Sequence, residues 1–156
     1  MTQEVLRHLS SPHDAPDGRG VARTGPGGRA GYYFWETADA RMCFAETGPF
    51  PDIAVTCGGP SAAERDHMPE LRPLFGPASD PAGGWYLIFR LGHGTVISST
   101  LEGNPVTAQR VRKLGPQVGG GQAYFIPLPH WPHDERLSVK VAVNGKQKTL
   151  TMNVDL

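Results

Sequence analysis

The amino-acid sequence predicts an all-β fold: an antiparallel β-sandwich, immunoglobulin-like or similar, with one short helix and a flexible N-terminal segment. In the second half of the chain, short apolar runs follow one another with little but turn residues between them. The clearest pair is 137–143 and 146–156, where apolar residues alternate with small or polar ones, the period of a half-buried strand. Between them, Asn144-Gly145 tolerates the positive φ angles of a type I′ turn. We therefore expect a hairpin in which Val139 faces Leu150.

The N-terminal residues predict a tail or linker instead of a folded element. Residues 2–9 are long enough for two helical turns, but residues 10–30 are mostly Ser, Pro, Asp, Gly and Arg. Such a segment buries too little apolar surface to offset the entropy lost on ordering. We expect residues 1–30 to be flexible and residues 31–156 to form a single β-sandwich domain.

The first half of the expected domain begins with an aromatic strand. The run Tyr32-Tyr33-Phe34-Trp35 predicts a strand buried on both faces, and more strands are predicted over 41–47 and 52–57. A carbohydrate-binding aromatic surface is the alternative for this run, but consecutive strand residues point to opposite faces, which favours a core. Ser61 and Glu64 form a capping box that predicts one short helix, ended by Pro69. We expect a loop over 73–84.

Four further strands are expected before the final hairpin. They are predicted over 85–91, 95–102, 106–114 and 122–128. In the second of them, Ile97 and Leu101 are expected to share one face. The proline near the end of the last one suits an edge strand or a strand end.

Cys43 and Cys57 predict a disulfide. They flank a hairpin loop around Phe50, and a symmetric register places them directly opposite one another. Opposed residues of an antiparallel pair lie about 4.5–5.5 Å apart at Cα, within the range that a disulfide accepts. The alternative is two reduced, buried cysteines of a cytosolic protein. Two sulfurs without further ligands at zinc spacing fall short of a metal shell, so we expect no metal here.

The overall composition excludes some partners. The chain has 156 residues, with 15 basic and 15 acidic ones, so it lacks the basic excess of a nucleic-acid-binding protein. No stretch is apolar enough for a spanning helix and no secretory signal is visible, so membrane contact would require a missing N-terminal anchor. Eleven of the basic residues are arginine, which together with abundant Gly, Ala and Pro indicates a GC-rich bacterial source.

The loop over 129–135 is the candidate ligand site. It contains His130, Trp131, His133 and Asp134, and imidazole and carboxylate groups are proper metal donors. The alternative is a polar loop, stiffened by prolines, whose tryptophan packs over the end of the sandwich. We favour this alternative and expect neither a metal nor a cofactor.

No catalytic residues are expected. Ser98 and Ser99 lie in the middle of a predicted strand, and no serine sits in a Gly-x-Ser-x-Gly elbow. His93 lies between two glycines, which is typical of a turn. The Gly119–Gly121 run precedes a strand instead of a helix, so it lacks the helix start that binds phosphate.

From Gly31 onward the chain resembles uncharacterised extracytoplasmic domains of actinobacterial membrane-anchored proteins. The features that carry the resemblance are the aromatic first strand, the two cysteines, the Trp85-Tyr86-Leu87 opening of a later strand and the run 124–128 before the final hairpin. The resemblance implies a β-sandwich outside the cytoplasm and brings no catalytic residues with it.

These observations predict a non-enzymatic binding or interaction module that acts outside the cytoplasm, where a disulfide persists. Its partner would be a protein or a cell-surface ligand. A structural subunit of a virion or secreted assembly is the alternative, in which the N-terminal arm orders on a neighbouring subunit. A small hydrolase is the second alternative, since catalytic groups are recognised by geometry and not by their order in the chain.

Overall fold

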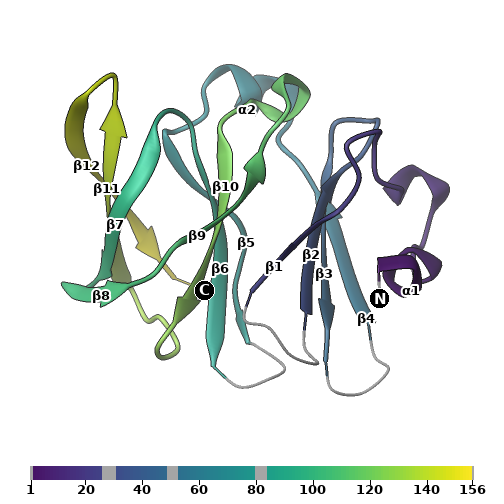
Figure 1. Ribbon diagram of the computed structural model, residues 1–156, viewed down its shortest axis with the longest axis horizontal. Coiled ribbons are helices and arrows are strands. Elements are labelled where there is room, and N and C mark those ends of the chain that lie inside the picture. The colour runs from purple at the N-terminus through teal and green to yellow at the C-terminus, as the bar shows by residue number, and fades with distance from the viewer. Residues whose placement is uncertain (1, 26–30, 49–52, 80–83, 156) are drawn as a thin grey trace. The chain divides into compact units, whose positions relative to one another are not determined.

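The computed structural model describes residues 2–25, 31–48, 53–79 and 84–155. In these residues, three four-stranded antiparallel sheets are accompanied by only two short α-helices (Figure 1), which confirms the predicted all-β fold class. The chain divides into two compact units, and this differs from the single domain expected over 31–156. The first unit is the chain up to His67 together with Leu114–Gly120; the second is Met68–Lys113 together with Gly121–Leu156.

The first unit is a four-stranded sheet with its strands in chain order, β1-β2-β3-β4. Its elements are α1 (Thr2–Arg7), the 3-10 turn η1 (Pro12–Asp14), β1 (Ala22–Thr24), β2 (Gly31–Glu36), β3 (Met42–Thr47), β4 (Ile53–Gly58), α2 (Ala62–Asp66) and a second 3-10 turn, η2 (Pro116–Val118). The loop expected around Phe50 lies outside the described residues.

The N-terminal residues contribute to the core of the first unit, in place of the flexible tail that we expected. Val5 is fully buried and packs in one hydrophobic cluster with Trp35 and Cys43, joined by the half-buried Leu9 and Val21. β1 adds to the sheet by pairing with β2. The average composition of residues 1–30 is polar, but their few apolar side chains converge on one side of an aromatic strand. The average composition of a segment does not predict where its few apolar side chains pack.

The aromatic strand β2 is buried at all six positions, as the sequence predicts. Trp35 and Tyr33 belong to the cluster that contains Val5, while Tyr32 stacks on Phe44 of β3 with ring centroids 5.7 Å apart. The run is therefore core and offers no exposed aromatic surface.

A buried carboxylate, Glu36, joins three segments of the first unit. Its side chain has no exposure, forms an ion pair with Arg19 and accepts hydrogen bonds from the Gly115 amide at 3.1 and 3.2 Å. Gln117 Nε2 lies 3.5 Å from the same carboxylate. Burial lowers the pKa of Arg19, but hydrogen bonding and charge pairing with Glu36, supported by Asp17, outweigh it and raise that pKa overall. Glu36 therefore positions both the N-terminal segment and the 114–117 segment.

The short helix α2 begins as predicted. Ser61 caps it, because its Oγ accepts a hydrogen bond from the Glu64 amide at 3.1 Å. The helix ends at Asp66, before Pro69. Arg65 then donates from Nη1 to the carbonyl of Gln117 at 2.6 Å, which ties α2 to η2.

The second unit is a β-sandwich. Its strands are β5 (Leu71–Ser79), β6 (Trp85–Leu91), β7 (Thr95–Leu101), β8 (Asn104–Val106), β9 (Gln109–Lys113), β10 (Gln122–Leu128), β11 (Glu135–Val143) and β12 (Lys146–Val154). One sheet has the order β5-β6-β10-β9 and the other β12-β11-β7-β8 (Figure 1). Residues from both sheets, among them Phe89, Ile126, Leu137 and Val139, form a single buried cluster. Apolar faces of two sheets are thus removed from water together.

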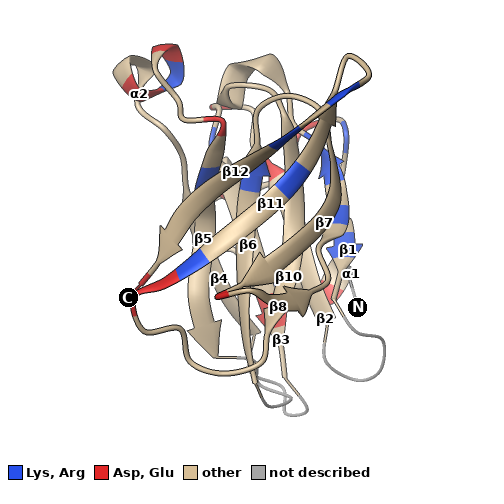
Figure 2. Ribbon diagram, turned by 90° about the vertical axis from the view of Figure 1, so that its left-hand side faces the viewer, with Lys and Arg blue, Asp and Glu red and all other residues tan. Residues whose placement is uncertain are grey.

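The β11–β12 hairpin has the predicted register. Val139 pairs with Leu150, and both residues of the Asn144-Gly145 turn have positive φ, 51° and 75°. β12 is the edge strand of its sheet. Lys146 and Lys148 on β12 are exposed, as is Lys140 on β11, and Figure 2 shows basic positions along both strands.

Two expectations for the second unit are wrong. The expected loop over 73–84 is, over its described residues up to Ser79, the edge strand β5; it pairs with β6 through two register shifts, and these accommodate Pro73 and Gly76. Ile97 does not share the buried face with Leu101 but is 47% exposed. The β7–β11 register shifts at this point, so Val96 pairs with Val141 and the inward alternation is interrupted.

We expect Glu36→Gln to lower the free energy of unfolding by about 1–3 kcal/mol, because the variant loses the charge that pairs with Arg19 and leaves hydrogen-bonding groups unmatched. Chemical denaturation monitored by circular dichroism measures this loss. Glu4→Gln is the control, since Glu4 is exposed and the same chemical change there should cost much less. Equal stability of the two variants would contradict the assigned role of Glu36.

We expect Gly94→Ala to destabilise the chain more than Gly145→Ala. Both glycines have positive φ, 85° and 75°, so both substitutions carry the same backbone penalty of about 1–2 kcal/mol. A Cβ at Gly94 would lie 2.4 Å from the Ala142 carbonyl oxygen, whereas a Cβ at Gly145 meets nothing within 4 Å. The steric conflict should therefore cost Gly94→Ala about 1–3 kcal/mol more. Thermal melts that rank the two variants equally would refute this explanation.

Candidate functional site

The loop between β10 and β11 places one large aromatic side chain at the surface. Trp131 is 42% exposed, and its ring meets that of the half-buried Trp85 edge to face, with centroids 4.1 Å apart and planes at 76°. The neighbouring Pro132 is buried and anchors the loop. The stiffened loop therefore holds the Trp131 ring in contact with a second aromatic ring, that of Trp85.

The two histidines of this loop do not converge. The exposed His130 hydrogen-bonds through Nε2 to Oε1 of Glu135, at the start of β11. The other carboxylate oxygen, Oε2, is buried and has no hydrogen-bond partner in the described residues. His133 is exposed, and no hydrogen bond or ion pair joins it to this pair in the described residues. The pair His130–Glu135 thus closes the loop onto the strand that follows it.

Asp134 belongs to a different environment, a polar pocket of about 310 Å³. Its lining also includes Glu102, Arg136 and Asn153. Glu102 Oε1 accepts a hydrogen bond from the Arg136 amide at 2.5 Å, and both acidic residues have left-handed backbones, with φ of 48° and 51°. The four residues singled out in the sequence therefore lie in separate surroundings and do not make one centre.

The other groups considered for catalysis have structural partners. His93 lies in the turn between β6 and β7 and contacts Glu70, with Nδ1 2.9 Å from Oε1. Ser99 Oγ donates to the Val106 carbonyl at 2.7 Å, which links β7 to β8. The Gly119 and Gly120 amides bond to the carbonyls of Pro116 and Gly115. These amides are used inside the loop and are not aimed at a phosphate.

A second pocket, of about 540 Å³, was not signalled by the sequence. Residues of α2 and of the 116–120 segment line it: Ala62, Arg65, Asp66, Pro116, Gly119 and Gly120. Arg65 in its lining donates to the Gln117 carbonyl, so this guanidinium supports the wall of the pocket.

Cys43 and Cys57 form the predicted disulfide. They are direct partners in the β3–β4 register, their sulfurs are 2.05 Å apart and their Cα atoms 4.1 Å apart. No other cysteine exists in the chain. The bridge closes a loop that spans 14 positions, and it links the edge strand β4 to its neighbour.

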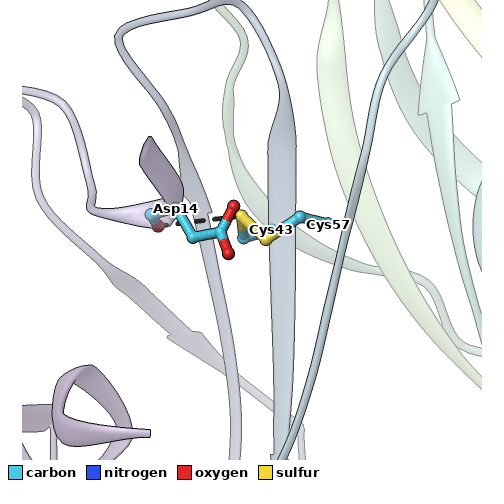
Figure 3. Close-up of side chains that lie close together, drawn as sticks. All are labelled: Asp14, Cys43 and Cys57. Atoms are coloured by element: carbon cyan, nitrogen blue, oxygen red, sulfur yellow. Dashed lines mark hydrogen bonds between the residues drawn. A yellow bond between two sulfur atoms is a disulfide. The ribbon is translucent and has the colours of Figure 1, made fainter. Parts of the chain in front are cut away.

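Asp14 lies beside this disulfide, although it is far from both cysteines in sequence (Figure 3). Its carbonyl oxygen is 3.8 Å from Cys43 Sγ; a sulfur in a disulfide carries no hydrogen, so this is a contact and not a donated bond. The same carbonyl accepts from Trp35 Nε1 at 2.7 Å. One carboxylate oxygen of Asp14 and the two sulfurs all lie within 4.8 Å of one another. Sequence spacing gave no signal for this arrangement, which depends on η1 packing against the sheet.

Arg41 fixes the carboxylate of Asp14. Its Nη1 lies 2.8 Å from Asp14 Oδ1, and its Nε contacts Asp39 at 3.0 Å. Hydrogen bonds to Asp39 and then to Asp14 raise the pKa of Arg41. The hydroxyl of Thr37 and then Arg41 lower the pKa of Asp39 by hydrogen bonding. The guanidinium remains charged and holds both carboxylates in place.

Among the residues that the structure describes, none forms a helix long and apolar enough to cross a membrane.

We expect removal of the disulfide by a Cys43→Ala/Cys57→Ala double substitution to lower the free energy of unfolding by about 3 kcal/mol, because a loop of this length constrains the unfolded chain. The thermal midpoint should fall by several degrees. Reductant should shift the midpoint of the wild-type chain and leave that of the double variant unchanged. Free thiols in the air-purified native protein, or an equal effect of reductant on both chains, would contradict the bridge.

Comparisons with protein-family models, with curated proteins and with solved structures find no match to this chain. Its function is therefore argued from the chemistry of its own residues.

Proposed function

We propose that this chain is a non-enzymatic binding or interaction module that acts outside the cytoplasm and contacts a protein or cell-surface ligand through Trp131. The exposure of Trp131 is the main support for this proposal. Among the described residues, Trp131 and Ile97 are the large hydrophobic side chains that remain exposed. Tryptophan is enriched at binding hot spots because it offers a large apolar surface with few rotatable bonds.

The surroundings of Trp131 support a preformed contact surface. Trp85 lies against its ring, Pro132 is buried beneath the loop, and the His130–Glu135 hydrogen bond closes the loop at its other end. A ring held in this way loses little conformational freedom when a partner covers it, so more of the contact energy is available for binding.

The disulfide supports a location outside the cytoplasm, because such bonds persist in oxidising compartments. The formal net charge of zero gives no support for a polyanionic partner.

We expect Trp131→Ala to weaken binding of the partner by about thirtyfold, which corresponds to a hot spot of roughly 2 kcal/mol. The immobilised full chain is first exposed to surface extracts and culture supernatant of the source organism. Binding of the captured partner to wild type, Trp131→Ala and Ile97→Ala is then compared by interferometry. Ile97→Ala is the matched control because it removes the other exposed hydrophobic side chain.

Equal losses in the two variants, or unchanged binding by Trp131→Ala, would contradict the proposed contact. Circular dichroism melts show whether each variant retains its fold. Light scattering on the wild-type chain adds a separate check: self-association into a larger assembly would favour a structural subunit over a binding module.

A further inference from the structure

We propose that reduction of the Cys43–Cys57 disulfide creates a metal site of the zinc type, in which the two thiolates and the carboxylate of Asp14 are the ligands. This inference does not rest on the proposed binding function. Sequence analysis excluded a metal at the cysteines because two sulfurs were too few. The structure supplies a third donor from a segment that the sequence predicted to be a tail.

The donor atoms are already close enough to share one ion. The two sulfurs and one Asp14 carboxylate oxygen lie within 4.8 Å of one another, and this is the one such group of three in the part of the chain that the structure describes. Zinc binds cysteine sulfur at about 2.3 Å and carboxylate oxygen at about 2.0–2.2 Å, so the two sulfurs, which are 2.05 Å apart in the disulfide, have to move apart after reduction to bind one ion. Figure 3 shows the carboxylate directed at the disulfide from the side opposite β4.

Each donor is held by bonds that do not depend on the sulfur–sulfur bond. Cys43 and Cys57 remain opposed because neighbouring residues of β3 and β4 pair in the same register. Asp14 is held through its carbonyl by Trp35 and through its amide, which donates to the Ser11 carbonyl at 3.0 Å. These bonds hold the three groups in place wherever the reduced chain keeps its fold.

Arg41 prepares the carboxylate for a metal. It contacts Asp14 Oδ1, while Oδ2 has no hydrogen-bond partner among the described residues, so one oxygen can bind an ion as the other stays oriented. Such an orienting contact is typical of metal ligands. Two thiolates, the carboxylates of Asp14 and Asp39, a divalent ion and the Arg41 guanidinium together carry one net negative charge. A divalent ion therefore offsets most of the negative charge that the two thiolates create beside Cys43, which is fully buried.

The chemistry requires a dithiol reductant. Its two thiols are oxidised to a disulfide, and the Cys43–Cys57 bond is reduced to two thiols by the transferred electrons and protons. The divalent ion then displaces both thiol protons to solvent and binds the thiolates. Soft sulfur donors favour zinc and copper(I) over magnesium and calcium. Three protein ligands leave one position for water, which reaches the site because Cys57 and Asp14 are only partly buried.

The test uses Co²⁺ as a coloured substitute for zinc. The full chain is reduced with dithiothreitol, desalted under argon and titrated with Co²⁺. We expect one ion per chain, the visible bands of tetrahedral Co²⁺ and a near-ultraviolet sulfur-to-metal band, all removed by added Zn²⁺. The oxidised chain should show none of these signals. A reduced chain that keeps its β-sheet circular dichroism but develops no sulfur-to-metal band would overturn the proposal.

Two variants distinguish ligation from a general effect on structure. Asp14→Asn should weaken Co²⁺ binding by more than about tenfold. Asp39→Asn is the matched control, because it removes the other carboxylate of Arg41 without removing a ligand, and it should bind as the wild type does. Equal affinities of the two variants would exclude Asp14 from the site. Cys57→Ser should lose most of the sulfur-to-metal band.

A further measurement covers the case in which the reduced chain unfolds. Metal binding is then coupled to folding, so Zn²⁺ should restore the β-sheet circular dichroism of the reduced wild-type chain. The Cys43→Ala/Cys57→Ala chain should not respond to Zn²⁺. If Zn²⁺ fails to restore the reduced wild type, or has the same effect on both chains, the proposed site does not exist.

Discussion

The carboxylate of Glu36 is the point at which three stretches of the first unit meet. It ends β2 inside the protein, pairs with Arg19 and accepts bonds from the backbone of Gly115. A buried carboxylate is tolerated only when its oxygens are matched by charge and hydrogen bonds, so those stretches must lie where they do. Arg65 extends the constraint to α2 through the Gln117 carbonyl. This explains why residues 114–120, which follow β9 in the chain, belong to the first unit.

Local sequence patterns predicted the strands well, whereas contacts between residues far apart in the chain were not predicted. The strand alternation, the Asn144-Gly145 turn and the cap at Ser61 depend on neighbours a few residues apart, and all three are present. The position of Val5 against Trp35 depends on residues 30 positions apart, and the exposure of Ile97 depends on a register shift in the partner strand. Neither the packing of Val5 nor the exposure of Ile97 produces a periodic pattern in the sequence. A proline-rich edge strand such as β5 has the composition that is typical of a loop.

The candidate sites also fall into those that follow from local sequence and those that depend on tertiary packing. The disulfide followed from symmetry about one hairpin, and the register bears this out. The four residues of the 129–135 loop are adjacent in sequence, yet Trp131, His130 and Asp134 have different neighbours, because a loop turns successive side chains in different directions. Asp14 joins the cysteines only through the packing of η1, so its role could not be found before the tertiary structure was known.

The lysines of β12 also limit how copies of this protein can meet. An edge strand presents unpaired amides and carbonyls and is a template on which another chain can extend the sheet. A second β12 added parallel to the first and in register with it would bring exposed Lys146 and Lys148 of the two copies side by side, and like charges across a strand pair repel. The lysines therefore disfavour in-register parallel extension of the sheet at this edge.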